Sequence, residues 1–102
     1  MLGGALAPRK RAVLRDLLVR NTTGDERIRA GVPRGWTVAD KTGTGGYGTI
    51  NDIAVVWPPK GEPLLIAIMS RRYVRNADYD EALIADTAEY VVTALTLSRP
   101  AR

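Results

Sequence analysis

The sequence predicts an α+β fold: a three-stranded antiparallel meander with an N-terminal helix and a C-terminal helix. Apolar side chains recur at helical spacing near the two ends of the chain, whereas they alternate with polar ones in the middle. Glycine- and proline-rich turns separate the strand segments, and such short connections join antiparallel neighbours. We assign residues 1–35 to the first helix and its connecting turns, 36–70 to the meander and 78–97 to the C-terminal helix.

The first helix is predicted over residues 8–20. Pro8 suits the first turn of a helix because an N–H there would have no helical partner. One apolar stripe follows, formed by Val13, Leu14, Leu17 and Leu18. Residues 21–24 end the helix, and Asp25 can cap a short turn that ends at residues 31–33.

The meander is predicted from strands at residues 36–44, 47–57 and 63–70. Gly45 and Gly46 can adopt positive φ at little cost, so the first reversal is expected there. The third strand is apolar on both faces, as in a sheet that is covered on both sides. Either the basic first helix therefore packs opposite the terminal helix, or part of the covering layer is not in this chain.

The C-terminal helix is predicted over residues 79–96. Asp78 and Glu81 have the spacing of a capping box, in which two side chains satisfy free N–H groups at the start of a helix. One face of this helix carries a row of apolar side chains, namely Ile84, Ala88, Val91 and Leu95.

Composition excludes several classes of function. The 102 residues contain no cysteine and no histidine, so we expect neither a metal nor a cofactor. The net charge of +4 is spread along the chain without a nucleic-acid-binding motif, so we expect no nucleic-acid partner. No apolar run approaches the ~20 residues that span a bilayer, so we expect no membrane partner. Residues 1–8 are too short for a signal peptide, so we expect a cytoplasmic chain if it is made as printed.

The end of the first strand, Lys41-Thr42-Gly43-Thr44, carries groups with chemical potential. Because side chains alternate along a strand, Lys41 and Gly43 share one face and the two threonines share the other. Gly43 allows another molecule to approach the backbone, and a free strand edge can pair with an amide-like ligand. The ammonium and the hydroxyl groups suit an anionic group on that ligand. The alternative is a surface hairpin with a solvated lysine.

Two nucleotide-binding motifs are excluded. Residues 43–48 match G-x-G-x-x-G, but a β-branched segment follows them where a dinucleotide site requires a helix. Lys41-Thr42 ends like a phosphate-binding loop, but Asp40 stands where that loop requires a glycine.

Five segments resemble, in order and with matching spacing, the C-terminal part of class A serine β-lactamases, especially the cefotaximase-like and actinobacterial branches. These segments are residues 21–25, 28–31, 35–38, 40–48 and 51–58, and the resemblance extends from about Leu2 to Leu97. It implies that residues 1–102 are a single partial domain of the β-lactamase and transpeptidase-like fold, a truncated fragment. The family it implies hydrolyses the β-lactam amide bond, confers antibiotic resistance and is exported.

The resemblance also implies roles for the first strand. Lys41 would support the nucleophile region electrostatically, and Thr42 and Thr44 would hydrogen-bond the β-lactam carboxylate. The Thr44 backbone N–H would form half of the oxyanion hole. Gly43 and Gly45 would complete the substrate-binding stretch by letting the backbone reach the substrate.

An arginine completes the implied carboxylate site. Many family members carry a carboxylate-binding arginine on the second strand, where Ile50 stands here. Arg27 matches the position from which some actinobacterial members supply the guanidinium instead, and a guanidinium binds a carboxylate with two parallel hydrogen bonds.

The chain departs from the family at the groups that break the β-lactam ring. It contains no S-x-x-K, no S-D-N and no Ω-loop glutamate, and its only serines are Ser70 and Ser98. We therefore expect no hydrolysis by the isolated chain. Two alternatives remain open. One is a non-catalytic module that binds β-lactams or peptides, or that complements the missing N-terminal β-lactamase segment. The other is a protein that buries its sheet against a second copy.

Overall fold

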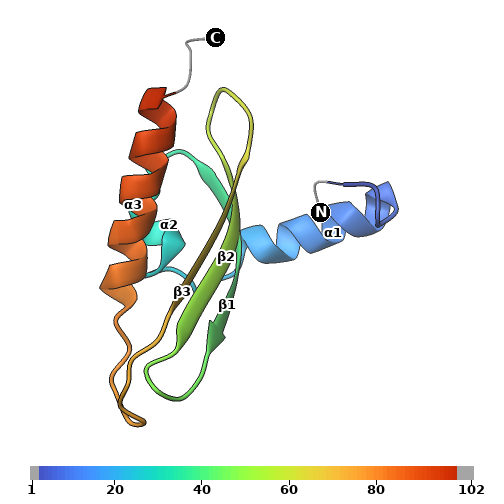
Figure 1. Ribbon diagram of the computed structural model, residues 1–102. Helices are drawn as coiled ribbons and strands as arrows, with labels where there is room; N and C mark the ends of the chain where they lie inside the picture. The colour runs from blue at the N-terminus through green and yellow to red at the C-terminus, as the bar shows by residue number, and fades with distance from the viewer. Residues whose placement is uncertain (1–2, 99–102) are drawn as a thin grey trace.

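The computed structural model describes residues 3–98 and confirms the predicted α+β fold with its antiparallel meander (Figure 1). The elements follow in the order α1 (Pro8–Val19), α2 (Ile28–Gly31), β1 (Thr37–Thr44), β2 (Ile50–Trp57), β3 (Leu64–Ser70) and α3 (Glu81–Ser98). Within residues 3–98, no helix is both long and apolar enough to cross a membrane.

The sheet has the order β1-β2-β3, so β2 is central and β1 and β3 are its two edges. Both pairs are antiparallel, with Thr44 opposite Ile50 and Val56 opposite Leu64. The second strand begins at Ile50 and not at residue 47, as the sequence predicted. The reason is local backbone geometry, because Tyr47 and Gly48 have φ of 61° and 62°, which belong to a turn and cannot continue a strand.

The start of α3 also differs from the prediction. The carboxylate that accepts a backbone hydrogen bond at this end belongs to Asp80, whose Oδ1 lies 3.1 Å from the Leu83 nitrogen. The predicted pair, Asp78 and Glu81, does not make this cap. Asp80 stands three residues before Leu83, which is the spacing at which an N-cap oxygen reaches a free N–H.

The hydrophobic core lies between one face of the sheet and the helices α2 and α3. Figure 1 shows α3 running along this face, with α2 against it. The sheet contributes Val38, Ile50, Ala54, Val56, Leu64 and Ile66, and the helices contribute Ile28, Ile84, Ala88 and Val92. All of these side chains are buried, and along each strand they alternate with residues on the other face; in β3 only one of the two predicted apolar faces is covered.

The opposite face of the sheet is only partly covered. Helix α1 lies on this side and points away from the sheet (Figure 1), and none of its residues is buried. It covers the end of the face near Trp57, where Arg15 stacks over the indole ring at 4.5 Å. Farther along, Leu65 and Met69 are 72% and 69% exposed. The first helix therefore does pack on the side of the sheet opposite α3, but it leaves part of this face exposed. We call the surface formed by Ile53, Leu65, Ala67 and Met69 the open face.

Helices α2 and α3 touch at the backbone of Gly31. A Cβ atom at this position would collide with the carbonyl oxygen of Ala85 and would lie 2.8 Å from the nitrogen of Glu89. Only glycine therefore allows the two helices to approach this closely, and the buried contact between Ile28 and α3 depends on that approach.

We predict that Gly31→Ala lowers the free energy of unfolding by about 1–3 kcal/mol, because the added methyl group must push α2 away from α3. Urea unfolding followed by circular dichroism measures the change. Gly46→Ala is the matched control, since no atom lies within 4 Å of a Cβ there, and we expect a change below about 1 kcal/mol. Equal stability of the two variants would contradict this account of the helix contact.

Candidate functional site

The residues singled out by sequence lie at the free edge of β1. Gly45 N–H donates to the Thr49 carbonyl oxygen at 2.9 Å, so Gly43 and Lys41, at alternate positions, also face β2 through their backbone groups. By the same alternation, the backbone N–H and C=O groups of Thr42 and Thr44 point away from β2. Two N–H donors and the Thr44 carbonyl oxygen are therefore free along this edge for strand-like pairing with a ligand, whereas the Thr42 carbonyl oxygen accepts from Lys41 Nζ.

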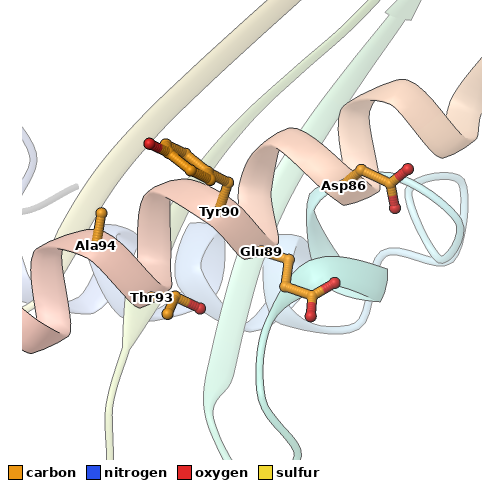
Figure 2. Close-up of a pocket in the computed structure, with 5 residues that line it drawn as sticks. All are labelled: Asp86, Glu89, Tyr90, Thr93 and Ala94. Carbon is orange, nitrogen blue, oxygen red and sulfur yellow. The ribbon is translucent and has the colours of Figure 1, made fainter.

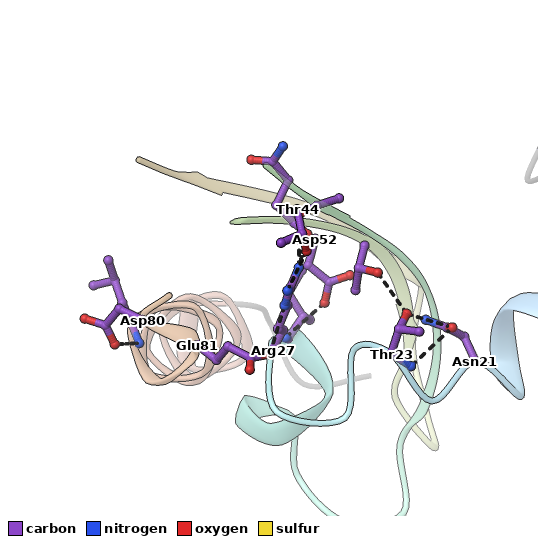
Figure 3. Close-up of polar contacts among 12 residues, drawn as sticks. Asn21, Thr23, Arg27, Thr44, Asp52, Asp80 and Glu81 are labelled. Atoms are coloured by element: carbon purple, nitrogen blue, oxygen red, sulfur yellow. Dashed lines mark hydrogen bonds and ion pairs between the residues drawn. The ribbon is translucent and has the colours of Figure 1, made fainter. Parts of the chain in front are cut away.

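Arg27 holds the end of this edge in place. It directly precedes α2, and its guanidinium reaches across the ends of β1 and β2 (Figure 3). Nε donates to Glu81 Oε2 at 3.0 Å, and Nη1 donates to the carbonyl oxygens of Gly43 and Asn51 at 3.1 and 3.0 Å. Nη2 donates to Thr44 Oγ1 at 2.9 Å. A guanidinium has five N–H groups, so only one of them is left for a ligand.

This clamp orients the hydroxyl group of Thr44. Because Thr44 Oγ1 accepts a hydrogen bond from Arg27, its own proton is free to point elsewhere. Arg27 itself is only 5% exposed, so its charge acts on the edge at short range and with little screening by water. A carboxylate that reaches this end of β1 would meet the Thr44 hydroxyl next to a buried guanidinium.

A chain of hydrogen bonds fixes the hydroxyl of Thr42. Asn21 Nδ2 donates to the Asp40 carboxylate at 3.2 Å, which leaves Asn21 Oδ1 to accept a hydrogen bond from Thr23 Oγ1 at 2.9 Å (Figure 3). Thr23 has one hydroxyl proton and has thus used it. The 2.8 Å contact between the Thr23 and Thr42 hydroxyl oxygens must therefore be donated by Thr42.

Lys41 supplies the remaining charge at the edge. Its side chain is exposed and its Nζ donates to the Thr42 carbonyl oxygen at 2.6 Å. No ion pair involves Lys41 in the part of the chain that the structure describes. This ammonium therefore makes the β1 edge attractive to an anion.

Two aspartates lie beneath this edge and were not identified as functional from the sequence. Asp40 and Asp52 are both fully buried on the core face of the sheet. Burial, the hydrogen bond with Asp40 and the negative charge of Asp40 raise the pKa of the Asp52 carboxyl to about 7. The alternation of side chains along a strand could have predicted that both aspartates are buried, because Asp40 shares its face with the buried Val38 and Asp52 shares its face with Ala54.

Pockets on the described surface include one beside the β1 edge and one on α3. One, of about 360 Å³, begins at Gly45 and continues along residues 46–48 and 75–79, so it extends the β1 edge. The other, of about 440 Å³, lies on the outer side of α3 (Figure 2). Its lining residues are Asp86, Glu89, Tyr90, Thr93 and Ala94. This second pocket is acidic and contains no residue of the β1 edge, so it does not suit the anionic ligand that the edge attracts.

The β1 edge thus collects hydrogen-bond donors without a group that attacks a substrate. Lys41, the Thr44 hydroxyl and the free N–H groups favour an anionic, amide-containing ligand. Among residues 3–98, no three or more acidic side chains gather in a way that could hold a metal ion. The arrangement is therefore suited to binding and to stabilising negative charge.

Comparison with known proteins finds a family model and individual proteins whose sequences are similar to this chain. The family model described as "Beta-lactamase enzyme family" matches residues 2–95. Beta-lactamase 3 of Bacillus cereus is 52% identical over 97 residues, which are 95% of this chain and 31% of that protein. Beta-lactamase FAR-1 of Nocardia farcinica is 57% identical over 95 residues, which are 93% of this chain and 30% of that protein.

Solved structures agree with the sequence comparison. A halotolerant bacterial beta-lactamase superimposes with a TM-score of 0.90 at 54% identity, covering 93% of this chain and 37% of the other. The beta-lactamase from Streptomyces albus G superimposes with a TM-score of 0.88 at 43% identity, covering 91% and 35%. This chain therefore spans about a third of the length of the proteins it matches.

We predict that Arg27→Lys lowers the free energy of unfolding by about 2–4 kcal/mol. A lysine ammonium cannot reach Glu81, Gly43, Asn51 and Thr44 together, so buried acceptors lose their donors. Chemical denaturation measures the loss. Arg20→Lys is the control, because Arg20 is exposed and pairs only with the exposed Asp16, so we expect a change within about 0.5 kcal/mol. An Arg27→Lys variant as stable as the control would refute the clamp.

Proposed function

The chain belongs to the β-lactamase enzyme family, and from that premise we propose that its β1 edge binds the carboxylate of a β-lactam. One observation carries this proposal: Arg27 binds the Thr44 hydroxyl oxygen and leaves the Thr44 proton free to donate. The same guanidinium keeps one N–H group for the ligand. The edge would thus offer a hydroxyl donor and a charged donor side by side, which is the combination that holds a carboxylate.

The other residues of the edge have distinct proposed roles. Lys41 attracts the anionic substrate, and Thr42 adds a second hydroxyl group. The backbone N–H of Thr44 points away from β2 and stabilises negative charge on the β-lactam carbonyl oxygen. Gly43 and Gly45 carry no side chains, so they allow the substrate to lie along the strand. These assignments are supported by the register of β1 against β2.

We propose that these residues contribute to β-lactam hydrolysis, the reaction that confers antibiotic resistance, but do not perform it alone. Hydrolysis by a serine enzyme requires a hydroxyl nucleophile with an adjacent base. Ser70 and Ser98, the only serines, have no lysine three residues after them. Thr44 is held by Arg27, a cation that cannot accept its proton.

The open face suggests where the complementary part would bind. Ile53, Leu65 and Met69 expose apolar side chains in one patch, and the free edge of β3 lies beside them. We propose that the remaining segment of a β-lactamase covers this patch and supplies the nucleophile. A second copy of this chain is the competing occupant, because it offers the same apolar surface.

We expect no turnover of nitrocefin by the purified 102-residue chain, because it lacks a nucleophile and a base. Absorbance spectroscopy measures the rate, with a complete β-lactamase as the positive control. Hydrolysis by this chain that disappears in Lys41→Ala would overturn the proposal that the edge only binds.

We predict that benzylpenicillin shifts the amide NMR signals of residues 42–45, and that Thr44→Val weakens this binding by about tenfold through loss of one charge-assisted hydrogen bond. Thr37→Val is the matched control, because Thr37 is an exposed threonine at the other end of the same strand. Shifts that are absent from residues 42–45, or equal affinities of the two variants, would contradict the proposed site.

A further inference from the structure

Asp40 and Asp52 form an unusual buried pair behind the β1 edge. Both side chains are completely buried and both point to the core face, Asp40 from β1 and Asp52 from the neighbouring β2. Asp40 lies opposite Ala54 and Asp52 lies opposite Thr42, so the two carboxyl groups are diagonal neighbours on one face of the sheet. A hydrogen bond between two carboxyl groups needs a proton, because ionised carboxylates only accept.

The hydrogen bonds around the pair show where that proton lies. Asp40 Oδ1 accepts from Arg29 at 2.8 Å and from Asn21 at 3.2 Å, and Asp52 Oδ2 accepts from the Ile28 backbone nitrogen at 3.1 Å. The other oxygen of each group, Asp40 Oδ2 and Asp52 Oδ1, has no donor within the described residues. Two buried acceptors without donors, on neighbouring carboxyl groups of the same sheet face, can be satisfied together by one proton between them.

Within residues 3–98, no arginine or lysine forms an ion pair with Asp52. Arg29 pairs with Asp40 at 2.8 Å, with Asp25 on its outer side at 3.7 Å. Arg27 attracts Asp52 from a distance, but its direct ion-pair partner is Glu81. A second negative charge would therefore be buried against Asp40, which is unfavourable unless a proton neutralises it.

We infer that Asp40 and Asp52 share one proton below neutral pH and together act as a pH-sensitive latch that fastens residues 21–29 to the sheet. Asp40 holds Asn21 and Arg29, whereas Asp52 holds the first N–H of α2. Between these two anchors lie Thr23 and Arg27, which touch the hydroxyl groups of β1. This inference goes beyond the proposed function and does not depend on β-lactam binding.

Gly24 keeps the latch closed to water. It is buried, and a Cβ atom there would collide with Asp40 Oδ2, the oxygen that faces the shared proton. The backbone of residue 24 therefore lies directly on the carboxyl pair. No side chain fits between this backbone and the pair, so the proton is held in a dry site.

The latch predicts a specific pH dependence of stability. Burial and Asp40 raise the pKa of Asp52 from 3.8 to about 7 in the folded chain. Below about pH 4 both the folded and the unfolded chain hold the proton, so its contribution is fully present. Between about pH 4 and 7 only the folded chain holds it, so the folding equilibrium constant falls by up to about tenfold per pH unit. Above about pH 7 the contribution is lost.

We test this with Asp52→Asn, whose amide N–H can replace the shared proton while its oxygen still accepts from Ile28. In the unmodified chain we expect the folding equilibrium constant to fall by up to about tenfold per pH unit between about pH 4 and 7. In Asp52→Asn we expect this contribution to the fall to be lost. Urea unfolding at each pH measures both chains. Asp86→Asn, a change of an exposed aspartate, is the control and should keep the original slope. Asp40→Asn should also lose the slope but be less stable than Asp52→Asn, because Arg29 loses its carboxylate.

Carboxyl carbon NMR of the unmodified chain gives an independent measurement. We expect the Asp52 signal to titrate with a midpoint near pH 7. A midpoint below about pH 5, or a slope in Asp52→Asn equal to that of Asp86→Asn, would overturn the shared proton. Loss of penicillin binding with both results intact would instead contradict only the proposed function.

Discussion

The guanidinium of Arg27 is the contact on which the geometry of the candidate site depends. It ties the start of α3 to the ends of β1 and β2, although these elements are far apart in the sequence. Arginine suits this position because its planar fork directs several donors at once, whereas a single ammonium cannot. The residue predicted to bind substrate is therefore also a structural part of the fold, and most of its hydrogen-bonding capacity is used before a ligand arrives.

Much of this architecture was predictable because periodicity reports which side chains are buried. The alternation of Val38, Ala54 and Val56 and the spacing of Ile84 and Ala88 gave the meander and the terminal helix correctly. Turn and cap details were harder to predict. The strand after the turn begins late because Tyr47 adopts positive φ, and Asp80 rather than its neighbours caps α3. Both outcomes depend on contacts that are set by tertiary structure and not by local preference.

The candidate site could be predicted only in part, because the sequence shows local motifs and not the contacts between distant segments. The triplet Lys41-Thr42-Gly43 was found by motif and its edge position by topology, but the contacts that orient it come from elsewhere in the chain. Thr23 and Glu81 reach the edge only through folding, and nothing in their local sequence indicates it. Asp40 and Asp52 carried a usable signal, since a carboxylate on the buried parity of a strand requires an explanation. The roles of the site residues in binding stay predictions.

The direction of the hydrogen bonds that end at Thr42 has a consequence for ligand selection. At rest this hydroxyl shows only lone pairs to the solvent, because its proton is turned toward Thr23. A ligand amide can dock on it without any rearrangement, whereas an anion can be accepted only after Thr42 and Thr23 rotate and the Asn21 oxygen gives up one donor. The preference for a neutral or an anionic group at Thr42 thus depends on how easily the hydroxyl groups of Thr42 and Thr23 rotate together. The chain of hydrogen bonds that resists this rotation ends at the buried carboxylate of Asp40.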